Sequence, residues 1–311
     1  MVEEPTTLTR QPAVRAHKAR PSRRRIFARR VLALVFVVGL VALLVGSAWA
    51  VLGGRGEEAP PAPVVAPPPK PLRIIFPEGF TREQMALRID EVNKIARDKR
   101  NVRPLLSPER YLALTDGAAR APRGFLRATE QPSHLEGFLF PATYEFTKRT
   151  TTRQLLNHQL TTFQKNWSKV NLRYARSKNL TPYDVLIIAS MVEKEVIAPE
   201  ERPLVSAVIY NRLKAGMTLG IDATIRYGLG VPPTESLRQS HLADPTPYNT
   251  RVHAGLPPTP IANPGLASMQ AAAHPAKVNY LFFVRKPDKI HHFFTASERE
   301  FINYKNAHGY G

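Results

Sequence analysis

Three ionisable residues, Glu193, Lys194 and Glu195, close an otherwise apolar run that spans residues 185–195 and reads "VLIIASMVEKE". The length and composition of this run predict a helix, in which successive residues are separated by about 100° around the axis. Counted from the first residue of the run, Glu193, Ser190 and Lys194 fall at about 80°, about 140° and about 180°. These three residues form one polar arc, which accounts for Glu193 and Lys194 as parts of an ordinary polar helix face.

Glu195 lies outside that arc, at about 280°, among the apolar side chains Ile188, Met191 and Val192. A carboxyl group in such surroundings loses solvation, which raises its pKa and keeps it protonated near neutral pH. A protonated carboxyl can act as a general acid on a leaving oxygen, as the glutamic acid of lysozyme does on a glycosidic oxygen. The alternative is structural, because Glu195 could simply pair with a cation such as Arg202 or Arg212.

Aromatic and acidic residues elsewhere are candidates for contacts with a saccharide. Glu136 lies in the stretch "LEGFLFPATYEF" at residues 135–146, where it could bind a sugar or remain a solvated loop charge. Tyr144 and Tyr248 could stack on the apolar faces of sugar rings, and packing in the core is the alternative for both.

Further polar candidates follow Glu195 along the chain. Asn211 or Arg212 could hydrogen-bond to the Glu195 carboxylate, or both could lie on an ordinary helix surface. Asp222 could supply a second carboxylate, bind substrate or cap a turn. Asn263, in "PIANPG", is expected to fix a turn.

The histidines do not indicate a metal centre. None of His274, His291 and His292 lies in a ligand spacing such as "HExxH". The sequence therefore predicts no metal site and no cofactor.

The helix that carries Glu195 must be held by its neighbours in the sequence. Thr181 can cap its first turn and Pro182 suits the first helical position. Pro199 limits its far end, and a further helix is expected from residue 202 to about 215. Residues 217–265 are rich in proline and glycine and are expected to form mainly loops.

The whole folded part is predicted to be of the α+β class, in two pieces. Residues 72–130 are expected to form a small strand-helix-helix subdomain, with a capping box from Thr81 to Gln84 and a second helix opening at Ser107. Residues 131–311 are expected to form a mixed α/β domain. It contains a helical stretch at 151–176, another after "NPG", and strands in "NYLFFVRK" and "HHFF".

An apolar segment precedes the folded part. Residues 31–52 contain no charged side chain and are long enough to cross a bilayer core of roughly 30 Å as a helix. Residues 1–30 carry nine Arg and Lys against two Glu, which predicts a cytoplasmic N-terminus and an exported remainder. A cleaved signal peptide ending at "SAWA" is the alternative, although the apolar run is longer than a typical signal core. Residues 53–71 are proline-rich and read as a semi-extended spacer.

The net charge of +19 is concentrated partly in the segment before the apolar run. A cytoplasmic location would favour nucleic acid as the partner, whereas the expected export argues against it and favours an anionic polymer or lipid surface. The chain contains no cysteine, so an exported domain must depend on its core rather than on disulfides.

Three long stretches resemble the endolytic murein transglycosylases, the MltG or YceG-like family. They lie at residues 135–146, residues 187–228 and residues 247–294, and they occur in the family's order behind one N-terminal anchor. The resemblance implies a membrane-anchored lytic transglycosylase that cleaves nascent peptidoglycan strands internally, with a LysM-like subdomain at 72–130 and a catalytic domain at 131–311. It also implies that Glu195, the second glutamate of "EKE", is the catalytic residue, and that cell-wall synthases are possible partners.

Not all of the family's pattern is present. The family commonly has Asp, Gln, Pro and Tyr at the positions that Ala142, Gly220, Ala223 and Arg251 occupy here. The residues that do match, and are therefore expected to line the substrate cleft, are Asp222, Thr224, Tyr227, Tyr248 and Asn249. The changes bear on substrate preference and rate rather than on the class of reaction.

Two other functions are open at this point. A hydrolytic muramidase would use Glu195 and Asp222 with water, and would leave reducing ends instead of anhydro ends. A non-catalytic scaffold would bind peptidoglycan and recruit synthases.

Overall fold

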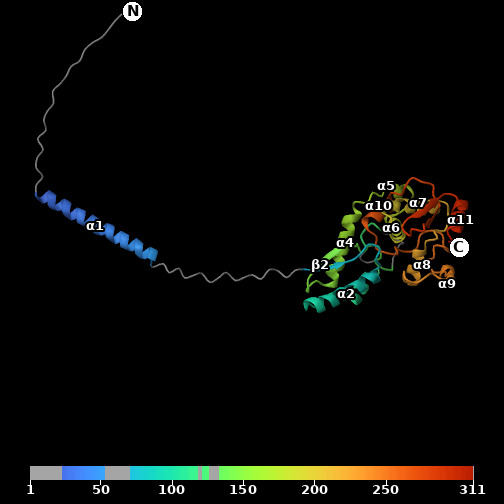
Figure 1. Ribbon diagram of the computed structural model, residues 1–311, viewed down its shortest axis with the longest axis horizontal. Helices are drawn as coiled ribbons and strands as arrows, with labels where there is room; N and C mark the ends of the chain where they lie inside the picture. The colour runs from blue at the N-terminus through green and yellow to red at the C-terminus, as the bar shows by residue number, and fades with distance from the viewer. Residues whose placement is uncertain (1–22, 53–70, 118–120, 126–132, 311) are drawn as a thin grey trace, which may run out of the picture. The chain divides into compact units, whose positions relative to one another are not determined.

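The computed structural model describes residues 23–52, 71–117, 121–125 and 133–310 and divides into two compact units, Met1–Pro68 and Pro69–Gly311 (Figure 1). The described residues form eleven α-helices, one short 3-10 helix and two sheets of two strands each. A mixture of helices and small sheets is therefore confirmed.

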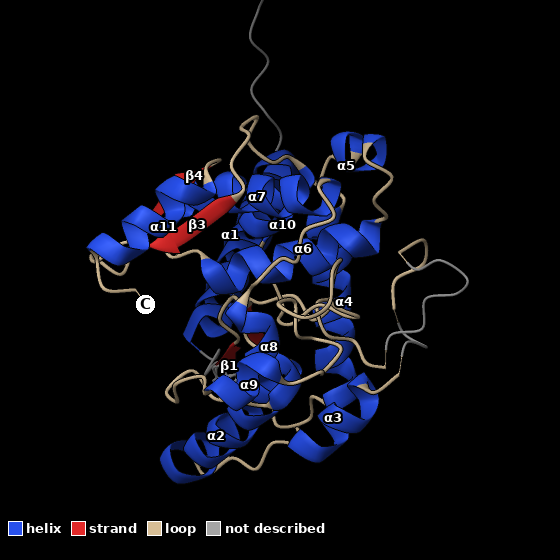
Figure 2. Ribbon diagram, turned by 90° about the vertical axis from the view of Figure 1, so that its right-hand side faces the viewer, coloured by secondary structure: helices blue, strands red, loops and turns tan. Residues whose placement is uncertain are grey.

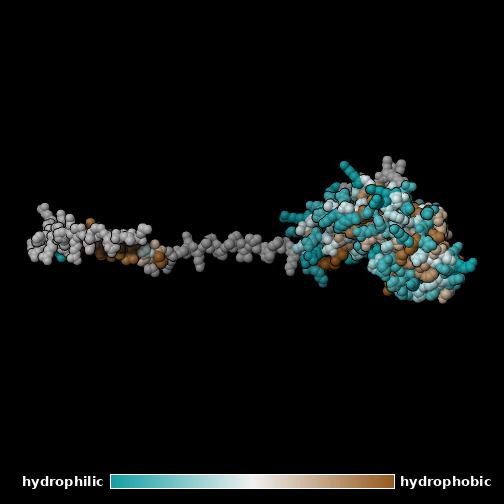
Figure 3. Space-filling model, turned by 90° about the horizontal axis from the view of Figure 1, so that it is seen from above, coloured by the Kyte–Doolittle hydropathy of each residue, from teal (hydrophilic) through white to brown (hydrophobic). Residues whose placement is uncertain are grey.

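The first unit contains one helix, α1 (Arg23–Leu52). Its segment Arg30–Val51 has a mean hydropathy of 2.8, and its large apolar side chains are exposed, including Phe36 and Trp49. Brown, the colour of hydrophobic residues, lies along part of this helix in the space-filling view (Figure 3). An apolar helix of this length fits a single-pass membrane anchor.

The second unit opens with β1 (Leu72–Ile75), α2 (Arg82–Arg100) and α3 (Pro108–Thr115), the predicted strand-helix-helix order. The capping box of Thr81 and Gln84 and the Ser107 cap are both confirmed. β1 pairs in antiparallel register with β2 (Thr143–Phe146), so that Leu72 faces Phe146. Because β2 comes from the stretch after residue 130, the two predicted subdomains share this sheet. Their separation at residue 130 stays a prediction.

The stretch predicted to be helical at 151–176 contains two helices, α4 (Thr152–Trp167) and α5 (Arg173–Ser177). α4 packs its apolar side into an aromatic cluster, with ring centroids 5.3 Å apart between Phe138 and Phe163 and 4.8 Å apart between Phe125 and Trp167. Aromatic contacts of this kind make a large contribution to the stability of a core.

α6 (Pro182–Glu195) is the central helix of the core. Tyr183 and every residue from Val185 to Val192 are buried, and the helix contacts α7 (Arg202–Lys214), α8 (Asp222–Leu229) and α10 (Leu266–Ala273). The labels of α6, α7 and α10 lie near one another in Figure 2. A helix that is apolar on all sides is expected to be covered on all sides. The 3-10 helix η1 (Pro199–Glu201) connects α6 to α7.

The loop-rich region predicted at 217–265 contains two helices, and the prediction was incomplete there. They are α8 (Asp222–Leu229), which ends at Gly230 in the left-handed region with φ 67°, and α9 (Gln239–Ala243). The two strands predicted near the C-terminus are β3 (Phe282–Arg285) and β4 (His292–Thr295), which pair as an antiparallel hairpin, and α11 (Glu298–Ala307) follows them. In the hairpin, Arg285 faces His292 across the ladder.

Candidate active site

Glu195 is the last residue of α6, and the following residue, Val196, caps the helix in an extended conformation. The local sequence explains this end, because Pro199 cannot continue the helix and the chain turns into η1. The side chain of Glu195 is half-buried. A carboxyl group is thus presented at the point where a buried helix leaves the core.

The backbone N–H of Ala223 acts on the carboxyl group of Glu195 and lowers its pKa. Ala223 is in the first turn of α8, whose N-cap residue Ile221 provides no side-chain cap. The first N–H groups of a helix lack partners within the helix and carry its positive partial charge. The N-cap residue Ile221 offers no acceptor for the N–H groups at the start of α8, and the Glu195 carboxyl group lies near one of them, the N–H of Ala223.

Loss of solvation by burial raises the pKa of Glu195 from 4.5 to about 7. Three charged groups modify this effect: Arg285 and Lys194 lower the pKa, and Asp222 raises it. The hydrogen bond from Ala223 also lowers it, because the N–H stabilises the ionised form. A carboxyl with a pKa near 7 is suited both to donate and to accept a proton at neutral pH.

Arg285 and Arg251 contact residues of this site from different parts of the chain. Arg285 of β3 donates from Nη2 to the backbone carbonyl of Glu195 at 3.2 Å. Arg251 donates to Oδ1 of Asp222 from both Nε, at 2.9 Å, and Nη2, at 2.7 Å. Arg251, one of the positions that departs from the family pattern, is thus the ion-pair partner of Asp222.

Glu193 and Lys194 do not form the solvated polar face that the helical wheel predicted. Ser190, the third member of that arc, is fully buried and accepts a hydrogen bond from the N–H of Ile261. Glu193 accepts from the N–H of Gly265 at 3.0 Å, and Lys194 donates to the carbonyl of Gly79 at 3.3 Å. The wheel was misleading here because most of α6 is buried, and its last three residues are only partly exposed.

Asn211 and Arg212 hold the C-terminal hairpin and direct their hydrogen bonds to backbone carbonyls. Nδ2 of Asn211 donates to the carbonyls of Val278 and Tyr280, at 3.0 and 2.8 Å. Nε of Arg212 donates to the carbonyl of Leu281 at 2.6 Å. These contacts join α7 to the segment leading into β3, whereas the predicted contact was with the Glu195 carboxylate.

Glu136 is fully buried, and desolvation raises its pKa to about 8. Both of its carboxyl oxygens accept from the N–H of Arg82 at the start of α2, and one accepts from Nδ2 of Asn263 at 2.5 Å. The hydroxyl of Tyr227 on α8 lies 3.3 Å from the other oxygen. Glu136 thus joins three segments far apart in the sequence, and contact with a sugar would require some of these groups to move.

The two tyrosines predicted to stack on sugars differ in their surroundings. Tyr144 is buried in β2 and donates to the carbonyl of Phe140 at 2.7 Å. Tyr248 is half-buried, with its ring centroid 5.1 Å from that of Tyr227 and its hydroxyl 2.8 Å from that of Thr259. Of the two, only Tyr248 retains partial exposure.

Thr224 and Asn249 are fully buried. The hydroxyl of Thr224 donates to the carbonyl of Ile221 at 2.7 Å, and Nδ2 of Asn249 donates to the carbonyls of Leu242 and Asp244. Both residues shape the loops around α8. Among the predicted substrate-binding residues, Asp222 is the one whose charge raises the pKa of Glu195. It precedes Ala223 in the first turn of α8.

The histidines considered as metal ligands have protein partners. Nδ1 of His292 lies 2.6 Å from Oε2 of Glu201, and both residues are buried. Nδ1 of His291 lies 2.9 Å from Oδ2 of Asp288. The ring centroid of His274 lies 6.2 Å from that of Tyr174.

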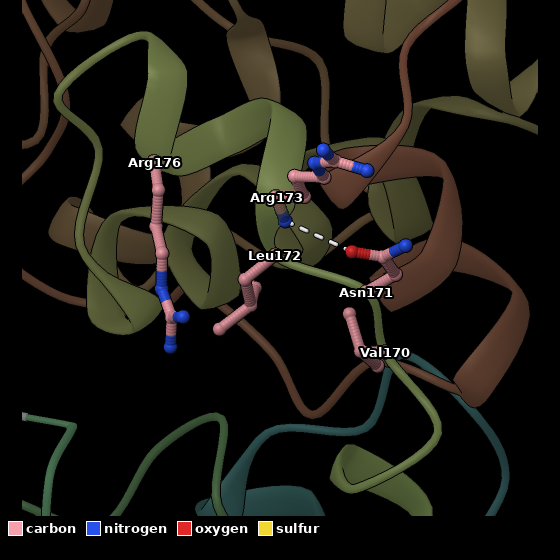
Figure 4. Close-up of a pocket in the computed structure, with 5 residues that line it drawn as sticks. All are labelled: Val170, Asn171, Leu172, Arg173 and Arg176. Atoms are coloured by element: carbon pink, nitrogen blue, oxygen red, sulfur yellow. Dashed lines mark hydrogen bonds between the residues drawn. The ribbon is translucent and has the colours of Figure 1, made fainter.

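A cavity of about 350 Å³ lies between α4 and α5, lined by Val170, Asn171, Leu172, Arg173 and Arg176 (Figure 4). The N–H of Arg173 donates to Oδ1 of Asn171 in its wall. None of the residues predicted for the site lines this cavity.

Sequence reasoning missed the groups that surround Glu195 from other elements. Arg285 is 90 residues away in the sequence, and the contribution of Ala223 comes from its backbone, which no side-chain pattern reveals. A signal for α8 was nevertheless present, because Asp222 suits a first helical turn and Gly230 suits the position after the last turn.

The chain was compared with known proteins. The profile of the YceG-like family matches residues 63–307. A protein named endolytic murein transglycosylase from Streptococcus pneumoniae (strain ATCC BAA-255 / R6) is 32% identical over 246 residues, which are 74% of this chain and 42% of that protein. One of the same name from Bacillus subtilis (strain 168) is 35% identical over 152 residues, 49% of this chain and 42% of that protein.

A solved structure of a YceG-like protein from Listeria monocytogenes aligns with a TM-score of 0.59 and 28% identity, over 78% of this chain and 77% of that one. The chain spans less than half the length of the curated relatives it matches. The family profile, however, covers most of the chain, including all of the elements around Glu195. The chain therefore belongs to the YceG-like family.

Proposed function

We propose that this protein is a membrane-anchored endolytic lytic transglycosylase of peptidoglycan, with Glu195 as its catalytic residue. Glu195 protonates the oxygen of the bond between N-acetylmuramic acid and N-acetylglucosamine, and the bond from that oxygen to C1 breaks. The resulting carboxylate takes the proton of the muramic C6 hydroxyl, whose oxygen bonds to C1 and closes a 1,6-anhydro ring. No water is consumed, and the carboxyl group ends the cycle protonated again.

The observation that carries this proposal is the carboxyl group of Glu195, which has a pKa of about 7 at the half-buried end of a buried helix. One carboxyl with this pKa can perform both proton transfers, because the nucleophile belongs to the substrate. The names of the relatives from Streptococcus pneumoniae and Bacillus subtilis support the same reaction.

Mass spectrometry of digested glycan strands tests the proposal. The full chain in detergent should produce fragments that end in 1,6-anhydro-muramic acid, and Glu195→Gln should abolish them while leaving glycan binding largely unchanged. A protein that binds strands and never cuts them would instead be the non-catalytic scaffold.

A hydrolytic muramidase is the second candidate, because the negative charge of Asp222 lies close enough to Glu195 to raise its pKa. Two carboxylates beside one bond are the usual arrangement for hydrolysis with water. The ion pair with Arg251 holds Asp222 in a fixed orientation, as a base or nucleophile would require. Reducing muramic ends, formed with uptake of one water per cut, would identify this reaction.

We further propose that α1 crosses the membrane with the N-terminus in the cytoplasm, and that residues from Pro69 onward act in the periplasm or at the outer face. The part formed by β1, α2 and α3 would serve as a LysM-like contact for glycan. A groove of about 510 Å³ between β1 and α2, lined by residues such as Leu72, Val92, Ile95 and Lys99, supports that role. Cell-wall synthases are the expected protein partners.

A further inference from the structure

The hairpin of β3 and β4 brings a positive charge to the end of α6. Arg285, the last residue of β3, donates to the carbonyl of Glu195 and lowers the pKa of the Glu195 carboxyl group. This contact joins residues 90 positions apart. The side chain of Arg285 is exposed, so its own packing does not fix its position.

A buried acid-histidine pair holds the opposite strand of the hairpin. Glu201, at the end of η1, accepts from both the backbone N–H of His292, at 2.8 Å, and its Nδ1, at 2.6 Å. Only 6% of Glu201 and 4% of His292 is exposed. The contact between Nδ1 and Oε2, together with the hydrogen bond from the backbone N–H, fixes the orientation of the His292 ring.

The register of the hairpin links this pair to Arg285. His292 is the residue directly opposite Arg285 in the β3–β4 ladder. Glu201 lies six residues after Glu195, in the short turn that leaves α6. Glu201 therefore ties the turn that follows Glu195 to His292. His292 lies opposite Arg285, and Arg285 in turn contacts the backbone carbonyl of Glu195. The ring of His292 is also packed against Phe283 and Phe294, which leaves little room for it to move.

We propose that Glu201 and His292 are positioning residues for the active site, because their buried pair holds Arg285 against the end of the helix that carries Glu195. This inference rests on the proposed function of Glu195. The pair does not touch the substrate, and its effect passes through Arg285 to the protonation of the Glu195 carboxyl group. The charged groups that act on that carboxyl are Arg285 from the hairpin, Asp222 from α8 and Lys194 from α6.

The test is the pH dependence of kcat/KM for glycan cleavage by the full chain in detergent. Arg285→Gln removes the positive charge, so the alkaline limb of the profile should move to higher pH by roughly half a unit to one unit. His292→Leu keeps Arg285 but removes the Nδ1 contact, and it should move the limb in the same direction. His292→Asn, whose amide can replace Nδ1–H as a donor to Glu201, should largely restore the original profile.

A control variant must show that loss of fold stability alone does not shift the alkaline limb of the kcat/KM profile. Tyr111→Phe is the matched control, because it removes a buried hydrogen bond of 2.8 Å to Gln159 between α3 and α4. It should lower Tm and leave the pH profile unchanged. The double variant Arg285→Gln with His292→Leu should shift the limb no further than Arg285→Gln alone.

Two results would overturn the inference while leaving the proposed function intact. In the first, His292→Leu lowers Tm but leaves the alkaline limb of the kcat/KM profile at the same pH as in the native chain. In the second, the alkaline limb of the double variant shifts by the sum of the shifts of the two single variants. Full activity of Glu195→Gln would instead reject the proposed function itself, so the two failures are distinguishable.

Discussion

Glu195 combines properties that a general acid needs and that a stable fold does not favour. Burial raises its pKa to about 7, and the partners that lower the pKa do not restore the ordinary value. Perturbed carboxyl groups of this kind are concentrated at functional sites. The same burial has consequences for activity and for stability, and they can be measured separately.

Activity should fall above neutral pH. Glu195 must be protonated to act as the acid, so kcat/KM is expected to decline as pH rises through about 7. Glu195→Gln should lower kcat by about 10²-fold or more, since it can neither donate nor accept the proton. Release of anhydro-muramic fragments, followed from pH 5 to 9, provides the measurement, and a profile that stays flat to pH 9 would contradict the assignment.

Stability should change in the opposite sense on the same substitution. The folded-state pKa of Glu195 is above the unfolded value of 4.5, so the folded protein binds more protons than the unfolded chain between pH 4.5 and about 7. The contribution of this group is therefore present in full at low pH and is lost as pH rises through the folded pKa. Glu195→Gln does not titrate, and at pH 8 it should be more stable than the native chain by about 1 to 3 kcal/mol.

Thermal unfolding of both chains at pH 4 and pH 8 tests this expectation. At pH 4, below the unfolded pKa, the two Tm values should nearly coincide, and at pH 8 the variant should unfold a few degrees higher. An equal difference at both pH values would show that the effect comes from packing and not from ionisation.

At the scale of elements, the site depends on two helix ends that meet. α6 ends at Glu195, and the uncapped start of α8 provides the N–H of Ala223. The hairpin of β3 and β4 adds Arg285 from a third direction. The arrangement of these elements, and not any one of them, determines how readily Glu195 loses its proton.

Ala223→Pro tests the contribution of α8. Proline is tolerated in the first turn of a helix but has no N–H, so the variant should keep α8 and lose the hydrogen bond to Glu195. The pKa of Glu195 should rise, and the alkaline limb of kcat/KM should move up by roughly half a pH unit. Ala223→Ser retains the N–H and serves as the control. An unchanged limb in the proline variant, with Tm preserved, would show that this N–H does not act on the carboxyl group.

At the scale of the whole molecule, an apolar helix precedes a unit with its own buried core. Val31 to Val51 expose their apolar side chains, whereas the core from Ile74 to Ala273 lies within the second unit. The basic residues before the apolar segment predict the orientation of the chain by the positive-inside rule.

The absence of cysteine from the sequence makes this orientation directly testable. Ser177→Cys, at the exposed last residue of α5, should react in intact cells or spheroplasts with a maleimide that cannot cross the membrane. Ser22→Cys, in the basic segment, should react only after the membrane is opened. Labelling of both sites, or of Ser22→Cys alone, in intact cells would contradict the proposed topology.

The sequence by itself determined the features that depend on local patterns. The apolar length of α1, the caps at Thr81, Thr181 and Ser107, and the isolation of Glu195 from the polar arc all follow from residue types at short spacing. The family was also evident from the sequence, because its motifs are long and ordered.

Only the tertiary structure decided which groups surround Glu195. The wheel treated Glu193 and Lys194 as parts of an ordinary polar helix face, but most of α6 is buried, and both residues have partners within the protein. The structure also placed Arg285 and the N–H of Ala223 beside Glu195, and turned Glu136 and Asn211 to contacts within the protein. Contacts between residues far apart in the sequence arise from packing of the whole chain, and no local pattern encodes them.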